Sequence, residues 1–273
     1  TSHVLMSLLR EELLDPSGCI LLTAFTNRAL DEICSKLCAA EIDFIHLGTQ
    51  HSCAPEFHSY LLEEKVAKCQ SVEEIRELIT QCRVFCGNTS RITSQRALFK
   101  LKRFSLAIVD EASQLLETQL LPLFCANEAA GEHPIQRFVL IGDHKQLPAI
   151  AQQADEKAEV TEHELQAIGL ENCKTSFFER FYRRYPNDPS VTYFLTKQAR
   201  MHEDIVAFVN YNFYQGRLVS RHLPHQHKPL PVYDIEQRTG SLLHILARRR
   251  FFWVGYVADA PAQAKWEEAK LIA

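Results

Sequence analysis

The chain has 273 residues, of which 46% are hydrophobic and 23% charged, a composition typical of one or two folded globular domains. Its net charge of −4 disfavours a large basic surface for nucleic acid, although amides, hydroxyls and a few arginines can still bind a strand locally. No apolar stretch approaches the roughly 18–20 residues that span a bilayer, and the first residues lack the features of a signal peptide. We therefore expect no membrane partner.

Nine cysteines are scattered through apolar segments. This distribution predicts reduced, mostly buried thiols in an intracellular protein, cytoplasmic or, in a eukaryote, nuclear. The pairs Cys34/Cys38 and Cys82/Cys86 have CxxxC spacing, so a metal or iron–sulfur site is an alternative. Because zinc modules commonly use a CxxC knuckle instead, we interpret these cysteines as core residues.

Apolar residues alternate between helical and strand-like spacing along the chain. We expect helices over residues 3–14, about 27–40 and 58–81, and strands over 19–25 and 42–47. Further strands are expected over residues 84–88, 106–110, 138–142 and 192–196. This alternation is typical of an α/β protein with a mostly parallel sheet that is covered by helices.

The remaining segments have weaker patterns. Residues 151–165 are charged and polar, which predicts a surface loop or a loosely packed helix, and residues 220–240 predict an extended loop. His222, His225 and His227 could bind a metal there, but no cysteine or acid cluster joins them in the sequence, so we interpret them as solvated. Residues 248–257 and 262–273 have the pattern of a strand and a following helix.

The run LAIVDEASQ (106–114) ends an apolar strand with two adjacent acids, Asp110 and Glu111. Burying both costs several kcal/mol unless a cation compensates, so the pair predicts Mg²⁺ nearby. Asp110 would hold the metal, and Glu111 would orient or deprotonate an attacking water.

The run FVLIGDHKQLPAI (138–150) also places polar residues after a strand. Gly142 permits a tight turn, and Gln146 can reach the γ-phosphate of a nucleotide through a neutral amide. Lys145 could belong to the same site, but it is equally well explained as a surface residue. Two strands that are each followed by polar residues are typical of the edge of a parallel sheet at which ligands bind.

Thr1 and Ser2 precede a predicted helix. A Walker A loop ends in Gly-Lys-Thr/Ser and runs into a helix, and its hydroxyl binds Mg²⁺. We interpret Thr1 as the end of such a loop and as a ligand of the metal. An arbitrary start of the sequence is the alternative.

These residues together resemble superfamily 1 helicases of the Upf-like branch (superfamily 1B), which are AAA-type P-loop ATPases. The similarity covers roughly residues 1–218 and, weakly, 248–273. It rests on runs that match motifs Ia, Ib, II, III and IV in order, namely ILLTAFTNRALDEI (20–33), VFCGNTSRI (84–92), AIVDEASQ (107–114), VLIGDHKQLPAI (139–150) and KQARMHEDIVAFVNYNFYQGRL (197–218).

The resemblance implies a P-loop NTPase fold with two RecA-like domains, ATP and Mg²⁺ between them, and single-stranded DNA or RNA across the top. Residues 1–190 would form the first domain, without its phosphate-loop strand and Gly-rich loop, and residues 191–273 would begin the second. The expected contacts to nucleic acid are Thr23, Thr26, Asn27, Gly87 and Thr89. Thr26 or Asn27 could also cap the following helix.

The resemblance implies that Gln198 and Arg200 contact the nucleotide, with Arg200 stabilising charge on the transferred phosphate. His202 is expected to pack against or cap the next helix. The family usually reads QYRMH where this chain has Gln198-Ala199-Arg200-Met201-His202. The absent Tyr would stack on the base, and its loss is expected to weaken nucleotide binding by about 1 kcal/mol.

The leading hypothesis is therefore an ATP-dependent helicase or translocase, with 5′→3′ movement implied by the resemblance. A non-hydrolysing nucleic-acid scaffold and a P-loop ATPase that remodels RNA–protein complexes without unwinding are the alternatives. Motifs V and VI and the Gly-rich loop are absent from these 273 residues, so we expect negligible ATPase activity from this polypeptide alone.

Overall fold

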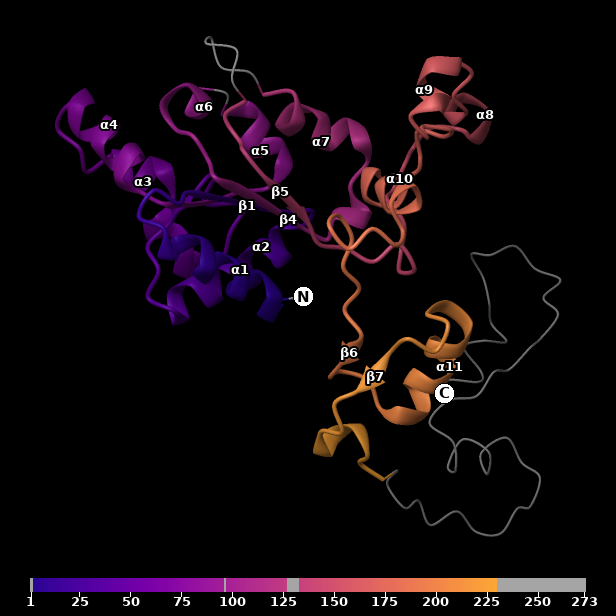
Figure 1. Cartoon of the computed structure of the whole chain (residues 1–273). Coiled ribbons are helices and arrows are strands. Elements are labelled where there is room, and N and C mark those ends of the chain that lie inside the picture. Colours follow the sequence, from indigo (N-terminus) through magenta and orange to yellow (C-terminus); the bar gives the residue numbers. More distant parts are fainter. Residues whose placement is uncertain (1, 96, 127–132, 230–273) are drawn as a thin grey trace, which may run out of the picture. The chain divides into compact units, whose positions relative to one another are not determined.

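The computed structural model describes residues 2–95, 97–126 and 133–229. It contains two compact units, Thr1–Thr192 and Tyr193–Ala273, which we describe separately (Figure 1). Among the described helices, none has the length and apolar character that would let it cross a membrane. All nine cysteines lie in the described segments and are free thiols, as the sequence predicts. The expectation that most of them are buried is wrong, because Cys125 and Cys173 are exposed and only Cys19, Cys34, Cys82 and Cys86 are buried.

The first unit is built on a five-stranded sheet in which every pair of neighbours is parallel. Its order is β2-β3-β1-β4-β5. The register places Ala24 opposite Asp110 and Leu22 opposite Cys86. The strands are β1 (Ile20–Ala24), β2 (Ile45–His46), β3 (Val84–Cys86), β4 (Leu106–Asp110) and β5 (Phe138–Leu140).

Helices cover both faces of this sheet (Figure 1), which confirms the predicted α/β class. Alternate residues of each strand face opposite sides, and both sides are apolar. Leu21 and Val109 pack in one core with α4, α5, α6 and α7, and Leu22 and Ile108 pack in the other with α1 and α2. The helices are α1 (Ser2–Leu14), α2 (Asn27–Ala39), α4 (Val72–Gln81), α5 (Thr89–Ser94), α6 (Leu98–Leu101) and α7 (Glu117–Phe124).

The helix predicted over residues 58–81 is wrong as a single element. The chain there forms a 3₁₀ helix, η1 (Pro55–Tyr60), then α3 (Leu62–Val66) and α4. Ser71 starts α4 afresh, because its hydroxyl oxygen accepts a hydrogen bond from the backbone N–H of Glu74 at 3.1 Å. Such a cap stabilises a helix start, although the apolar spacing continues across the break.

Short helices complete the first unit. The polar segment 151–165 contains α8 (Asp155–Ala158) and the start of α9 (His163–Ala167), and α10 (Phe177–Arg184) follows. Arg180 of α10 makes two hydrogen bonds to Glu117 of α7, at 2.9 and 2.5 Å. Both side chains are largely buried, so this paired contact fixes α10 on α7.

The second unit contains the parallel pair β6 (Lys197–Gln198) and β7 (Val219–Ser220), helix α11 (Glu203–Phe213) and the 3₁₀ helix η3 (Pro224–Gln226). The strand predicted over residues 192–196 is wrong, because the strand there begins only at Lys197. The strand and helix expected over residues 248–257 and 262–273 lie outside the described residues.

Candidate functional site

Asp110 is the last residue of β4 and is 9% exposed. Burial raises the pKa of its carboxyl group above the ordinary value of 3.8, because a charged group loses favourable contact with water. One carboxylate oxygen accepts a hydrogen bond from the backbone N–H of Glu111 at 3.1 Å. A cation bound here would offset the cost of the buried charge.

Glu111 has a left-handed backbone conformation with φ of 53°. A residue with a Cβ rarely adopts this conformation, and such outliers concentrate at functional sites. The Gln114 side-chain amide donates a hydrogen bond to the Glu111 carboxylate at 3.4 Å. Glu111 and Gln114 thus lie on one short turn directly after Asp110, formed by the 3₁₀ helix η2 (Ala112–Gln114) with Glu111 before it.

The loops after β4 and β5 are joined directly. The backbone N–H of Ala112 donates to the carbonyl oxygen of Ile141 at 2.8 Å, and that of Asp143 donates to the Ser113 hydroxyl oxygen at 3.1 Å. Gly142 lies so close that a Cβ on it would be 2.8 Å from the backbone nitrogen of Ser113. Gly142 is therefore needed for this close approach, and not only for a turn.

Asp143 organises the segment that contains Gln146. One of its carboxylate oxygens accepts from the backbone N–H of Lys145 at 3.0 Å, and the other accepts from the Gln146 side-chain amide at 2.9 Å. The side chains of Lys145 and Gln146 are exposed. Gln146 is thus held beside the loop of Asp110 and Glu111, with its surface open to a ligand.

The loops after β1 and β3 also meet. The Asn88 side-chain amide donates to the Asn27 side-chain oxygen at 3.0 Å, which links the starts of α2 and α5. Thr26 caps α2 by accepting from the backbone N–H of Ala29 at 3.1 Å, so the expected capping role is confirmed. Because Thr26 and Asn27 are exposed, they can also contact a ligand.

Thr23 differs from the expectation for a residue that contacts nucleic acid. Its side chain is fully buried, and its hydroxyl has no hydrogen-bond partner among the described residues. A bound nucleic acid cannot reach this hydroxyl in the structure. The reason is that β1 is the central β-strand of the sheet and that both faces of the sheet are covered by helices. Gly87 is buried and Thr89 is only 6% exposed. The exposed members of the predicted set are Thr26 and Asn27.

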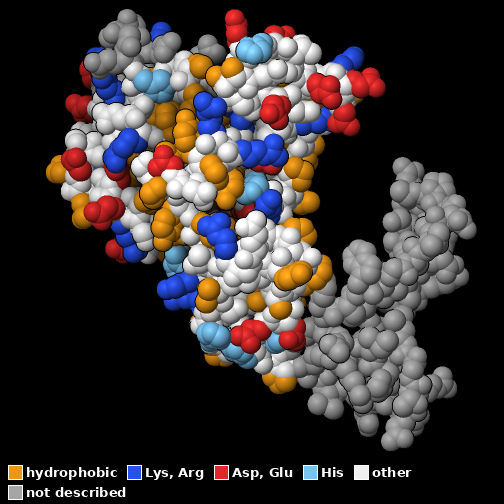
Figure 2. Space-filling view, turned by 45° about the vertical axis from the view of Figure 1, so that its right-hand side comes forward, with side chains coloured by type: hydrophobic (Ala, Val, Ile, Leu, Met, Phe, Trp, Pro, Cys, Tyr) orange, Lys and Arg blue, Asp and Glu red, His pale blue; other side chains and the backbone are white. Residues whose placement is uncertain are grey.

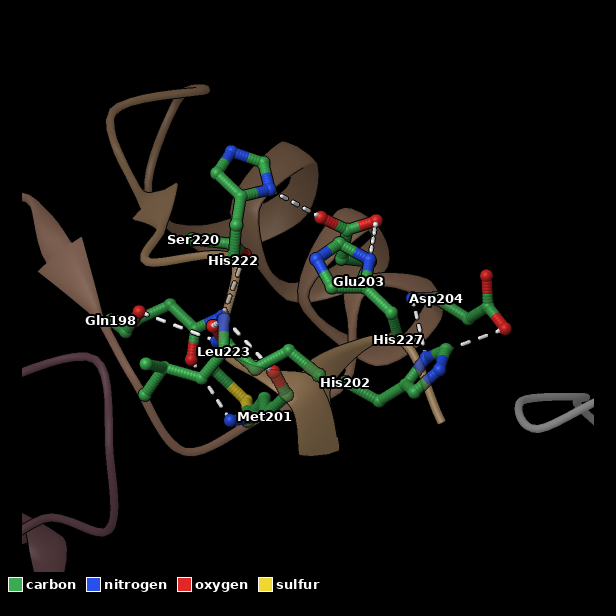
Figure 3. A network of polar contacts seen from close by, with 10 residues as sticks. Gln198, Met201, His202, Glu203, Asp204, Ser220, His222, Leu223 and His227 are labelled. Atoms are coloured by element: carbon green, nitrogen blue, oxygen red, sulfur yellow. Dashed lines mark hydrogen bonds and ion pairs between the residues drawn. The ribbon is translucent and has the colours of Figure 1, made fainter. Parts of the chain in front are cut away.

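The loop that contains Arg200 lies in the second unit and is held by Gln198 (Figure 3). The Gln198 side-chain oxygen accepts from the backbone N–H groups of Arg200 and Met201, at 3.1 and 2.9 Å. Its amide donates to the Met201 carbonyl oxygen and the Ser220 hydroxyl, at 3.1 and 2.7 Å. Gln198 therefore positions the loop in this structure, whereas the Arg200 side chain is exposed.

His202 caps α11, as expected, by accepting from the backbone N–H of Asp204 at 3.2 Å. The histidines that follow β7 are exposed, as expected, but the expectation that no acid joins them is wrong. Nδ1 atoms of His222 and His227 lie 3.1 and 3.0 Å from the two carboxylate oxygens of Glu203 (Figure 3). The sequence missed this contact because Glu203 is on a separate element, α11.

Thr1, the predicted end of a phosphate loop, lies outside the described residues. Sequence reasoning also missed two residues that matter for the arrangement, Ser113 and Asn88. Asn88 had a usable signal, because an Asn directly before a helical segment commonly caps it. Its side-chain oxygen accepts from the backbone N–H of Arg91 at 2.9 Å.

Two family models, both described as an AAA domain, match residues 62–154 and 173–252. The DNA replication ATP-dependent helicase/nuclease DNA2 of Gallus gallus is 31% identical over 202 residues, which cover 73% of this chain and 18% of that protein. The related JHS1 of Arabidopsis thaliana is 32% identical over 200 residues, or 73% of this chain and 13% of that protein. The chain belongs to the Upf-like branch of the superfamily 1 helicases.

This superfamily 1 helicase chain spans about a fifth or less of the length of the curated relatives it matches. A further curated relative is the DNA polymerase alpha-associated DNA helicase A of Saccharomyces cerevisiae. It is 30% identical over 167 residues, which cover 58% of this chain and 22% of that protein. Among solved structures, the Pyrococcus furiosus Hef helicase domain matches 51% of this chain and 24% of its own, with 12% identity and a TM-score of 0.33.

Proposed function

We propose that this chain is part of an ATP-dependent helicase or translocase that hydrolyses ATP with Mg²⁺ and moves along single-stranded nucleic acid. The observation that carries the proposal is the joined pair of loops after β4 and β5. They bring two acids, Asp110 and Glu111, together with the amide of Gln146 at the carboxyl edge of a parallel sheet. Ligands of open α/β sheets bind at this edge.

Each residue then has a defined task. Asp110 would hold Mg²⁺, and its burial fits a cation that keeps the carboxylate ionised. Glu111 would orient the attacking water and accept its proton, while Gln146 would donate a hydrogen bond to the terminal phosphate. Mg²⁺, when bound, would neutralise charge on the phosphates. The positively charged Arg200 of the second unit would stabilise the negative charge on the transferred phosphate. Thr1 would be a further metal ligand.

Thr26 and Asn27 would bind the sugar–phosphate backbone through a hydroxyl and a side-chain amide, with the loop at Gly87 beside them. Contacts of this kind do not depend on base sequence. Such contacts need no large excess of basic side chains, and the chain has a net charge of −4. On the face of the molecule that Figure 2 shows, Lys and Arg side chains are interspersed with Asp and Glu. The relatives are named as DNA helicases, so DNA is the substrate to test first and RNA the second.

The test uses the full product of the gene that encodes this chain. ATPase activity is measured with no nucleic acid, with single-stranded DNA and with single-stranded RNA. We expect stimulation by a single strand, and loss of turnover in Glu111→Gln but not in the matched control Glu164→Gln, whose exposed side chain lies on α9. An intact protein that is not stimulated, or that keeps its turnover in Glu111→Gln, contradicts the proposal.

One observation favours a second candidate, a clamp or remodelling ATPase that does not unwind. Ala199 occupies the place where the family usually has Tyr, and it has no aromatic ring that could stack on the base of a nucleotide. Its carbonyl oxygen lies 2.7 Å from Nε2 of His225. A strand-displacement assay beside the ATPase assay separates these functions. ATPase activity without displacement would favour remodelling, and strand binding without ATPase activity would favour the clamp.

A further inference from the structure

Three potential metal ligands lie together inside the first unit, away from Asp110. They are Cys34 on α2, His46 at the end of β2 and Cys86 at the end of β3. One ligand atom from each lies within 4.8 Å of the other two. All three side chains are at most 1% exposed, and apolar residues of α1, α2 and the sheet surround them.

His46 is the residue in this cluster that needs a partner. Neither of its ring nitrogens has a hydrogen bond within the described part of the chain, although both are buried. An unsatisfied buried polar atom is costly, and native structures contain few of them. Gly48 packs against the ring, because a Cβ on Gly48 would be 2.6 Å from Nδ1. The ring is thus held beside the two thiols by close packing.

The two sulfur atoms are spaced as a metal would require. Sγ of Cys34 and Sγ of Cys86 are 3.6 Å apart. Zn–S bonds of about 2.3 Å at a tetrahedral angle separate two sulfurs by about 3.8 Å, whereas a disulfide needs about 2.05 Å. The two sulfur atoms are therefore spaced as two zinc ligands, and a ring nitrogen of His46 lies within 4.8 Å of each of them.

We propose that Cys34, His46 and Cys86 bind one Zn²⁺ ion. Two thiolates and one imidazole are ligands that zinc prefers, and two thiolates neutralise its charge in an apolar interior. Cys53, which packs against the same core, is the candidate for the fourth ligand. The site is independent of the proposed nucleotide chemistry.

The placement of this ion gives it a structural role. Cys34 lies on the helix that begins after Thr26, and Cys86 directly precedes Gly87 and Asn88. The ion would tie α2, β2 and β3 together behind the two loops that the Asn27–Asn88 hydrogen bond joins. Zinc would thus hold the proposed nucleic-acid loops in register.

Cobalt titration of the full chain tests the site. The protein is reduced, freed of metal by a chelator and titrated with Co²⁺, whose bonds to thiolate give a charge-transfer absorption band. We expect one Co²⁺ per chain with this band, and its displacement by Zn²⁺. A wild-type protein that folds and gives no thiolate band overturns the proposal, whatever the variants do.

Variants assign the ligands. Cys34→Ser and Cys86→Ser should each weaken binding by more than about 100-fold, since even losing a group that only orients a ligand costs 10–100-fold. Cys38→Ser and Cys82→Ser are matched controls from the same CxxxC pairs and should keep the band. His222→Ala excludes the exposed Glu203 cluster, which has no thiol. If the band survives in both Cys34→Ser and Cys86→Ser, the proposed ligand set is wrong.

Discussion

The backbone N–H of Asp143 donates a hydrogen bond to the hydroxyl oxygen of Ser113 at 3.1 Å. Together with the backbone hydrogen bond from Ala112 to the Ile141 carbonyl oxygen, it joins the loop of Asp110 and Glu111 to the loop of Gln146, about thirty residues further along the chain. Ser113 is 4% exposed, so water does not easily replace it as the acceptor. The relative position of the proposed catalytic groups therefore depends on a residue that has no catalytic task of its own.

Ser113→Ala should impair turnover more than stability. Losing one hydrogen bond of this kind costs about 1 kcal/mol of unfolding free energy. The loop of Gln146 also loses a contact that holds it to the loop of Glu111. We expect a lower kcat for the nucleic-acid-stimulated ATPase of the full-length protein, with nucleotide affinity little changed. Ser94→Ala, which removes an exposed hydroxyl on α5, is the control. Equal kcat in both variants would argue against a positioning role.

Gly142→Ala should destabilise the first unit. The new Cβ would meet the backbone nitrogen of Ser113 at 2.8 Å, and backbone cannot move aside as a flexible side chain can. Overpacking of this kind costs about 1–3 kcal/mol, which urea denaturation of the purified chain measures. Lys145→Ala, on an exposed neighbour, should change stability little. A Gly142→Ala protein as stable as the wild type would show that the loops separate at no cost.

Asp110→Asn should stabilise the fold at neutral pH and abolish Mg²⁺-dependent nucleotide binding. Burial raises the pKa of Asp110, so the folded state binds this proton more tightly than the unfolded state does. The wild type therefore loses unfolding free energy as pH rises from the ordinary value of 3.8 through the raised pKa. The advantage of Asn should be full at neutral pH and shrink toward about pH 4. Urea denaturation of both proteins at neutral pH and at about pH 4 measures this difference in unfolding free energy. An Asn variant that is less stable than the wild type at neutral pH would contradict a raised pKa for Asp110.

Thr26→Ala should have two separable effects. Loss of the α2 cap costs about 1 kcal/mol of unfolding free energy, and loss of the hydroxyl removes a proposed contact to nucleic acid. Thr26→Ser keeps a capping oxygen and serves as the control. We expect weaker binding of a labelled single strand by the Ala variant only, measured by fluorescence anisotropy at fixed salt. Unchanged affinity with reduced stability would leave Thr26 as a cap alone.

Much of the fold follows from local patterns. The strand over residues 106–110 is predictable because a parallel strand covered on both faces must be apolar throughout, and the same argument finds β1, β3 and β5. The break between α3 and α4 is not predictable from apolar spacing, since that spacing continues through it. Thr23 also misleads, because the sequence places a hydroxyl near a strand end and does not say that both faces of that strand are covered.

Spacing along single segments is enough to predict the α/β class, the order of the motifs, the place of Asp110 and Glu111 at a strand end and that of Gln146 in the loop after a strand. Which groups from distant segments meet depends on the folded arrangement of those segments. The CxxxC spacings pair Cys34 with Cys38 and Cys82 with Cys86, yet the fold brings together Cys34 and Cys86. That contact depends on strand order and on how α2 packs against the sheet, which are set by burial of the whole core and by no local spacing.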